Sequence, residues 1–253
     1  MKKIFILITT LTVLFSKAQT VIVNYTERRI INKERLDEMP EFMKKEATQE
    51  HNYILNYNDG ISMYKNSSEN KNFESETKKT TENKEITYKI TNKSITKYYY
   101  KNISKDKILF NFTSGSNNFY GNDNFLKWEW QFTEETKKIN GFICKKATST
   151  AYGYNFTAWY TEDVAINAGP EKFDGLPGLI IYLGTPYFEW IATSVKIEKT
   201  PIEIEEPKIV AKTYTMLEIN KINKDAMSKL RNSSTNETSG NTTTKNETFI
   251  LKN

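Results

Sequence analysis

The sequence predicts a mainly β (α+β) domain, built as one curved antiparallel sheet or open half-barrel with one N-terminal and one C-terminal helix. Strand patterns follow one another at roughly 8–12-residue spacing without helices between them, which disfavours a parallel α/β sheet. The 253 residues include 15 Tyr, 14 Phe and 4 Trp, and these aromatic side chains supply large units of buried area. We therefore expect a single β-rich domain over residues 19–230.

Residues 1–18 have the three parts of a secretory signal peptide. Lys2 and Lys3 precede an apolar core, and Ser16 and Ala18 are the small residues expected before a cleavage point. The apolar run is shorter than the roughly 20 residues that a helix needs to span a bilayer. Cleavage would remove three lysines and lower the net charge from +5 to +2 (5 − 3). We expect a mature protein in the periplasm or at the cell surface that neither spans a membrane nor binds nucleic acid.

The first part of the mature chain predicts a strand, an interrupted helix and a hairpin. Residues 20–25 are rich in β-branched side chains and form the expected opening strand. Residues 32–49 place apolar side chains at helical spacing, but Pro40 would break or kink the helix. Asp59-Gly60 lies between the alternating runs 51–57 and 61–64, and this pair is typical of a tight hairpin turn.

Residues 65–85 contain a single apolar residue, Phe73. Such a stretch cannot bury a core, so we expect a long mobile loop there. Strand patterns then follow at 86–90, 97–101, 107–112, 127–132, 141–148 and 152–161. In the fourth of these, Trp128, Trp130 and Phe132 alternate with polar residues, which predicts a half-buried strand.

The segment 153–186 holds five of the ten glycines and three of the six prolines. This density predicts irregular backbone between strands. Further strands are expected at 179–183, 187–197 and 208–213, followed by an amphipathic helix from Met216 to Leu230. Residues 231–253 read as a low-complexity polar tail, because Asn, Ser and Thr supply 13 of the 18 residues in 231–248.

The glycine-rich segment contains the hexapeptide Gly175-Leu-Pro-Gly-Leu-Ile180. Before it run Trp159-Tyr-Thr-Glu162, Gly169-Pro170 and Phe173-Asp174, and residues 139–147 lie upstream. In these residues the sequence resembles the GLPGLI family of signal-bearing bacterial proteins, over roughly residues 50–200. The resemblance implies export in bacteria with an outer membrane and a shared β-rich domain. It implies no activity and no catalytic residues.

Two interpretations of the hexapeptide remain open. In the first it is a structural turn: Pro177-Gly178 would occupy the centre of a type II turn with positive φ at Gly178, and Gly175 would allow close approach of backbone. In the second, Gly169–Gly178 is a rigid loop at the mouth of a cleft that takes a peptide or an apolar ligand. The candidate binding residues are Trp159, Tyr160, Gly169, Pro170, Phe173, Gly175, Leu176, Pro177 and Gly178.

The sequence offers few catalytic groups. One cysteine, Cys144, excludes an intrachain disulfide and fits core packing, and one histidine, His51, excludes every multi-histidine metal site. Glu162, Asp163 and Asp174 would serve a carboxylate-based hydrolase only if two of them flanked one cleft. We predict no catalytic residue, no metal and no cofactor.

These observations favour a non-enzymatic exported protein, acting as a binding or structural module of the cell envelope. Its partners would be envelope proteins or an extended peptide, with an outer-membrane transporter as one candidate. Two alternatives stay open: a half-barrel carrier of lipid or another apolar ligand, and the carboxylate-based hydrolase.

Overall fold

The computed structural model describes residues 20–67, 73–81, 84–92, 97–114 and 117–236. The expected signal peptide and residues 237–253 of the expected tail lie outside this part of the chain. Within it, no helix is long and apolar enough to cross a membrane.

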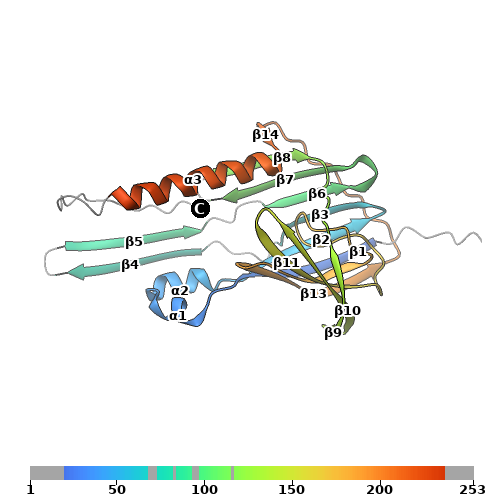
Figure 1. Cartoon of the computed structure of the whole chain (residues 1–253), viewed down its shortest axis with the longest axis horizontal. Coiled ribbons are helices and arrows are strands. Elements are labelled where there is room, and N and C mark those ends of the chain that lie inside the picture. Colours follow the sequence, from blue (N-terminus) through green and yellow to red (C-terminus); the bar gives the residue numbers. More distant parts are fainter. Residues whose placement is uncertain (1–19, 68–72, 82–83, 93–96, 115–116, 237–253) are drawn as a thin grey trace, which may run out of the picture.

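One open sheet of twelve strands forms the body of the molecule (Figure 1). Its strands are β1 (Thr20–Arg29), β2 (His51–Asn58), β3 (Ile61–Asn66), β6 (Tyr98–Asn102), β7 (Lys107–Ser114), β8 (Asn117–Asp123), β9 (Gln131–Ile139), β10 (Phe142–Ala151), β11 (Tyr154–Thr161), β12 (Leu179–Gly184), β13 (Phe188–Glu198) and β14 (Thr213–Tyr214). They lie in the order β14-β8-β7-β6-β3-β2-β1-β13-β12-β11-β10-β9. The predicted mainly β class and open sheet are confirmed. The sheet is mixed rather than purely antiparallel, because β14 pairs with β8 in parallel.

The helices lie at both ends of the chain. Pro40 divides the predicted N-terminal helix into α1 (Lys33–Glu38) and α2 (Glu41–Ala47), because its ring cannot continue a helix from the residues before it. The C-terminal helix α3 (Met216–Asn236) begins where predicted, next to β8, and continues beyond residue 230 into the expected polar tail. A short 3-10 turn, η1 (Ile103–Lys105), links β6 and β7.

The predicted hairpin forms between β2 and β3. Asp59 and Gly60 have φ values of 46° and 79°, the left-handed pair that a type I′ turn requires. The predicted hairpin and its turn are therefore confirmed.

The expected loop at 65–85 is replaced by strand structure at 73–81 and 84–85, while residues 68–72 and 82–83 lie outside the described part of the chain. Strands β4 (Phe73–Thr81) and β5 (Lys84–Asn92) pair in antiparallel fashion as a separate two-stranded sheet, which Figure 1 shows extending away from the main sheet. A strand pair is held by its backbone hydrogen bonds, so polar composition does not prevent it. The predicted strand 86–90 lies within β5.

Three further strand predictions need correction. Residues 124–130 are irregular, and the strand placed at 127–132 begins only at Gln131. The strand expected at 208–213 is reduced to Thr213–Tyr214. Strand β8 was not predicted, because its Asn-rich and Gly-containing sequence gives little apolar alternation.

The hydrophobic core covers one face of the main sheet, here called the core face. Val21, Val23 and Tyr25 of β1 point to it and are almost completely buried. A row of contacting rings crosses this face from strand to strand, namely Tyr25, Tyr64, Tyr99, Phe110, Phe112, Phe119 and Tyr214. Such ring pairs stabilise a fold by more than the burial of their apolar area alone.

Candidate functional site

The hexapeptide belongs to a connection between β11 and β12, here called the linking segment (residues 162–178). The segment forms short backbone hydrogen bonds within itself, including Phe173 N–H to the carbonyl of Pro170 at 3.0 Å. It joins the sheet through the N–H groups of Leu179 and Ile180, which donate to Val164 and Ala168 at 3.0 Å each. The buried hydroxyl of Tyr25 donates to the carbonyl of Ile180. The segment is thus an ordered part of the core.

The nine predicted site residues do not share one surface. Tyr160, Gly169, Pro170, Phe173, Leu176 and Gly178 are buried, and Gly175 and Pro177 are exposed. Trp159 is half-buried on the opposite face of the sheet from its neighbours Ala158 and Tyr160. The structural interpretation of the hexapeptide therefore describes most of these residues, and only Phe173 and Trp159 line the cavities described below.

The two glycines of the hexapeptide exchange the roles predicted for them. Gly175 has the positive φ, +84°, whereas Gly178 is absent from the left-handed residues. A Cβ atom on Gly178 would lie 2.0 Å from the carbonyl oxygen of Thr161. The predicted type II turn at Pro177-Gly178 is therefore wrong: Gly178 is needed because the end of β11 passes against it.

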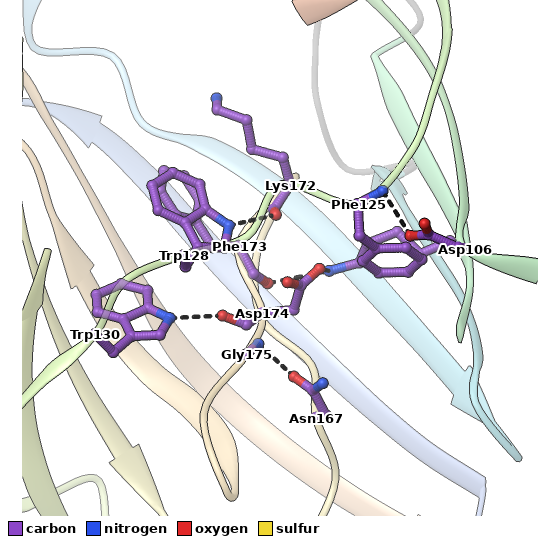
Figure 2. Close-up of polar contacts among 10 residues, drawn as sticks. Asp106, Phe125, Trp128, Trp130, Asn167, Lys172, Phe173, Asp174 and Gly175 are labelled. Carbon is purple, nitrogen blue, oxygen red and sulfur yellow. Dashed lines mark hydrogen bonds and ion pairs between the residues drawn. The ribbon is translucent and has the colours of Figure 1, made fainter. Parts of the chain in front are cut away.

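Two tryptophans hold the linking segment by its backbone (Figure 2). The indole N–H of Trp128 donates to the carbonyl of Lys172 at 3.2 Å, and that of Trp130 donates to Asp174 at 2.8 Å. The Trp128 ring stacks on Phe173, with centroids 4.6 Å apart. The predicted two-residue alternation thus places both indoles on one side, although this stretch is not a strand.

A buried lysine anchors the same residues from the sheet. Lys101 of β6 is 2% exposed, and its Nζ donates to the carbonyl of Phe173 at 3.0 Å and to Oδ2 of Asp174 at 3.4 Å. Burial lowers the pKa of Lys101 and raises the pKa of Asp174, although each group partly offsets this effect on the other. Sequence analysis missed this pair, because 73 residues separate the two partners.

A second lysine, Lys97, lies between two carboxylates. Its Nζ is 2.6 Å from Oε2 of Glu27 and also contacts Glu171. Burial alone would lower the pKa of Lys97, but Glu171 and Glu27 outweigh it and raise this pKa well above its usual value. Burial acts likewise against the charge of Glu171, yet Lys97 and Lys172 lower the net pKa of its carboxyl. The indole of Trp190 donates to Glu27 at 2.8 Å.

A cavity of about 640 Å³ opens on the core face beside these charges. Glu171, Lys172 and Phe173 of the linking segment form part of its wall, while Glu27 and Lys97 lie in the same wall. Ten residues contribute aromatic rings, namely Tyr53, Tyr99, Phe112, Tyr152, Tyr154, Phe156, Phe173, Tyr187, Phe188 and Trp190. The cavity also reaches α3 through Met216, Ile219, Asn220 and Asn223.

The remaining candidates have separate surroundings. Cys144 is fully buried, as predicted. His51 begins β2 and lines the cavity, and burial lowers its pKa. Glu162 is exposed and pairs with Lys145 at 2.7 Å. Neither Glu162, Asp163 nor Asp174 lines the cavity, so this site does not bring together the carboxylates of the hydrolase alternative.

The geometry therefore defines an open mainly β domain whose glycine-rich linking segment walls an aromatic cavity. A family model described as "Protein of unknown function (Porph_ging)" matches residues 150–182, which contain β11 and the linking segment. No curated protein matches the chain.

Two solved structures of PNGF-II, in space groups P21 and C2, are similar to the chain. The sequence identities are 21% and 20%, and both TM-scores are 0.45. Each alignment covers 73% of this chain and 29% of the PNGF-II chain. The chain thus spans less than a third of the length of PNGF-II.

We expect Gly178→Ala to destabilise the fold by more than about 3 kcal/mol, because its Cβ would overlap backbone that cannot move aside alone. Urea unfolding followed by circular dichroism measures this. Gly153→Ala is the control, since its Cβ meets nothing within 4 Å and only its φ of +82° disfavours it. Equal losses in the two variants would contradict the close approach at Gly178.

Lys101→Met should cost about 3–5 kcal/mol of unfolding free energy, since it leaves Asp174 buried without its cation. Combining it with Asp174→Asn should cost less than the sum of the two single variants, which a double-mutant cycle measures. Lys145→Met removes an exposed lysine paired with Glu162 and should change stability little. Additive single effects would show that Lys101 and Asp174 do not interact.

The charge of Glu171 should stabilise the fold only above acidic pH. Its pKa lies below the ordinary 4.5 in the folded state, so its contribution is present above about pH 4.5 and is lost as pH falls through the folded value. Glu171→Gln should therefore be less stable than wild type at pH 7, with the difference shrinking below about pH 4.5. Unfolding curves across pH measure this, with Glu198→Gln, at an exposed position of β13, as the control. A difference that grows with acidity would contradict the proposed pairing.

Proposed function

We propose that the mature chain is a non-enzymatic binding module of the cell envelope, whose cavity takes a ligand with an apolar body. The observation that carries this proposal is the 640 Å³ cavity with its ten aromatic side chains. Its volume falls within the range of about 300–1,000 Å³ that is usual for small-molecule sites. The signal-like residues 1–18 support export, which places the ligand outside the cytoplasm.

The residues that form the cavity wall are held in place by other parts of the protein, which favours a binding site that is formed before the ligand enters. Residues 171–174 are held by the indoles of Trp128 and Trp130 and by Lys97 and Lys101. A wall that is fixed before binding loses little conformational entropy when a ligand enters. Lys97, Glu27 and Glu171 at the cavity already pair with one another, which leaves the rings as contact area for a ligand.

An apolar ligand fits this cavity better than an extended peptide. A peptide that joins a sheet needs free backbone groups along one strand edge. The cavity is lined from β1, β2, β3, β6, β7, β11 and β13, and each of these strands has a neighbour on both sides. We therefore favour the carrier of apolar ligands over the peptide-binding module, and an envelope protein would be a partner at another surface.

A bulky side chain placed inside the cavity should weaken binding of an apolar ligand. Asn220 of α3 lines the cavity, whereas its neighbour Lys221 is exposed and does not. We expect Asn220→Trp to weaken binding of the neutral fluorescent probe N-phenyl-1-naphthylamine by about tenfold or more, because the added indole occupies probe space. Fluorescence titration of the purified mature chain measures the affinity.

Lys221→Trp adds the same side chain outside the cavity and should bind like wild type. Native mass spectrometry of protein purified from envelopes should in addition detect a co-purified apolar molecule in wild type and less of it in Asn220→Trp. Probe affinity that is equal in all three proteins, together with no co-purified molecule, would refute the carrier function.

A further inference from the structure

A second hollow lies on the face of the main sheet opposite the cavity. Its volume is about 820 Å³, and it is lined from β9, β10, β11, β12 and β13 with Arg28 of β1. Arg28, Thr185 and Pro186 also line the cavity, whereas the other residues that line this hollow do not. We call it the basic groove.

Trp159 lies in this groove with an unused hydrogen-bond donor. The indole N–H groups of Trp128, Trp130 and Trp190 each donate to a protein oxygen. Trp159 is the remaining tryptophan of the sequence, and its indole has no acceptor within the described residues, nor is it among their buried unpaired groups. Its half-buried ring and free N–H therefore offer both an apolar face and a donor to a ligand.

The charges of the groove are strongly unbalanced. Arg28, Lys137, Lys138 and Lys146 line it with a single carboxylate, Glu189. Arg28 pairs with Glu189, and Lys146 pairs with Glu135 at 2.7 Å.

The other two lysines, Lys137 and Lys138, have no carboxylate partner among the residues that the structure describes. The Nζ of Lys137 lies 5.7 Å from the centroid of the Trp159 ring, so unpaired positive charge and an aromatic face share one place. An anion that also presents an apolar face would match both features.

Neutral polar side chains complete the lining. Asn155 and Thr157 precede Trp159 at two-residue intervals along β11 and line the same groove. Asn155 accepts a hydrogen bond from Thr150 through Oδ1, which leaves its amide N–H groups for a ligand. The amide and hydroxyl groups can hydrogen-bond to hydroxyl groups of a ligand. The neighbouring tryptophan ring can at the same time pack on an apolar face of that ligand.

We propose that the basic groove binds an acidic oligosaccharide. The C–H face of a sugar ring would pack on Trp159, its carboxylate would pair with Lys137 and Lys138, and its hydroxyls would bond to Asn155 and Thr157. A sugar acid meets all three features, whereas a free phosphate leaves the tryptophan unused. A nucleic acid would also stack and pair here, but the mature net charge of +2 disfavours it (5 − 3). None of these five ligand-binding residues lines the cavity on the core face.

The test uses the full mature chain and isothermal titration calorimetry with three probes. These are a short oligogalacturonate, a neutral maltooligosaccharide of the same length, and a short oligodeoxythymidylate. Wild type should bind the oligogalacturonate at least about tenfold more tightly than either of the others. Added salt should weaken this binding, because exposed ion pairs are screened.

Variants assign the binding to the groove. The double variant Lys137→Gln/Lys138→Gln should bind oligogalacturonate about tenfold more weakly. Lys196→Gln/Lys199→Gln removes the same charge at exposed positions outside the groove and should stay within about twofold of wild type. Trp159→Ala should also weaken binding, whereas Trp159→Phe, which keeps a ring, should retain most of it.

Three results would overturn the proposal: no binding of oligogalacturonate by wild type, tighter binding of the oligodeoxythymidylate, or equal losses in the two double-lysine variants. Circular dichroism of every variant separates lost binding from lost folding. Blocking the core-face cavity with Asn220→Trp should leave oligogalacturonate binding unchanged, so this test succeeds or fails independently of the apolar-ligand function.

Discussion

The position of the linking segment depends on two lysines, Lys97 directly before β6 and the buried Lys101 within it. Lys97 and Lys101 flank Tyr99 on the same side of the chain at β6, and each meets a carboxylate of the linking segment. A buried charge without a partner costs several kcal/mol, so the segment cannot slide along β6 without breaking both pairs. The lysines therefore fix the register of residues 171–174 more strictly than apolar packing alone, which tolerates small shifts.

This register connects the hexapeptide to the cavity beside it. Within residues 171–174, three residues bond to the lysines, two accept the indole N–H groups of Trp128 and Trp130, and Phe173 faces the cavity. Their main-chain oxygens are used for structure, and their side chains divide between ion pairs and cavity wall. The stretch directly before the hexapeptide is thus both an ordered part of the core and part of the cavity wall.

Local signals in the sequence predicted local structure well, and contacts across the chain poorly. Asp59-Gly60 and Pro40 act through their own backbone, so the hairpin and the helix break were predictable. The pairing of Lys101 with Asp174 depends on how β6 meets a segment 73 residues away, and no local pattern marks it. The role of Gly178 is of the same kind, because the atom that excludes a side chain there belongs to Thr161. The strand β4, and with it the partner of the predicted strand 86–90, was missed because a predominantly polar stretch was equated with a loop.

The two faces of the sheet differ because the strands from β9 to β13 bear polar and charged side chains away from the core. Asn140, in the turn between β9 and β10, donates to the carbonyl of Ala192 in β13 at 2.7 Å. This bond connects the two ends of that group of strands and places Lys137 near Trp159. β9 is an edge strand whose charged residues also discourage pairing with other chains. Its uncompensated lysines therefore have a structural reason to be there, and only the free indole beside them distinguishes a binding groove from a merely protected edge.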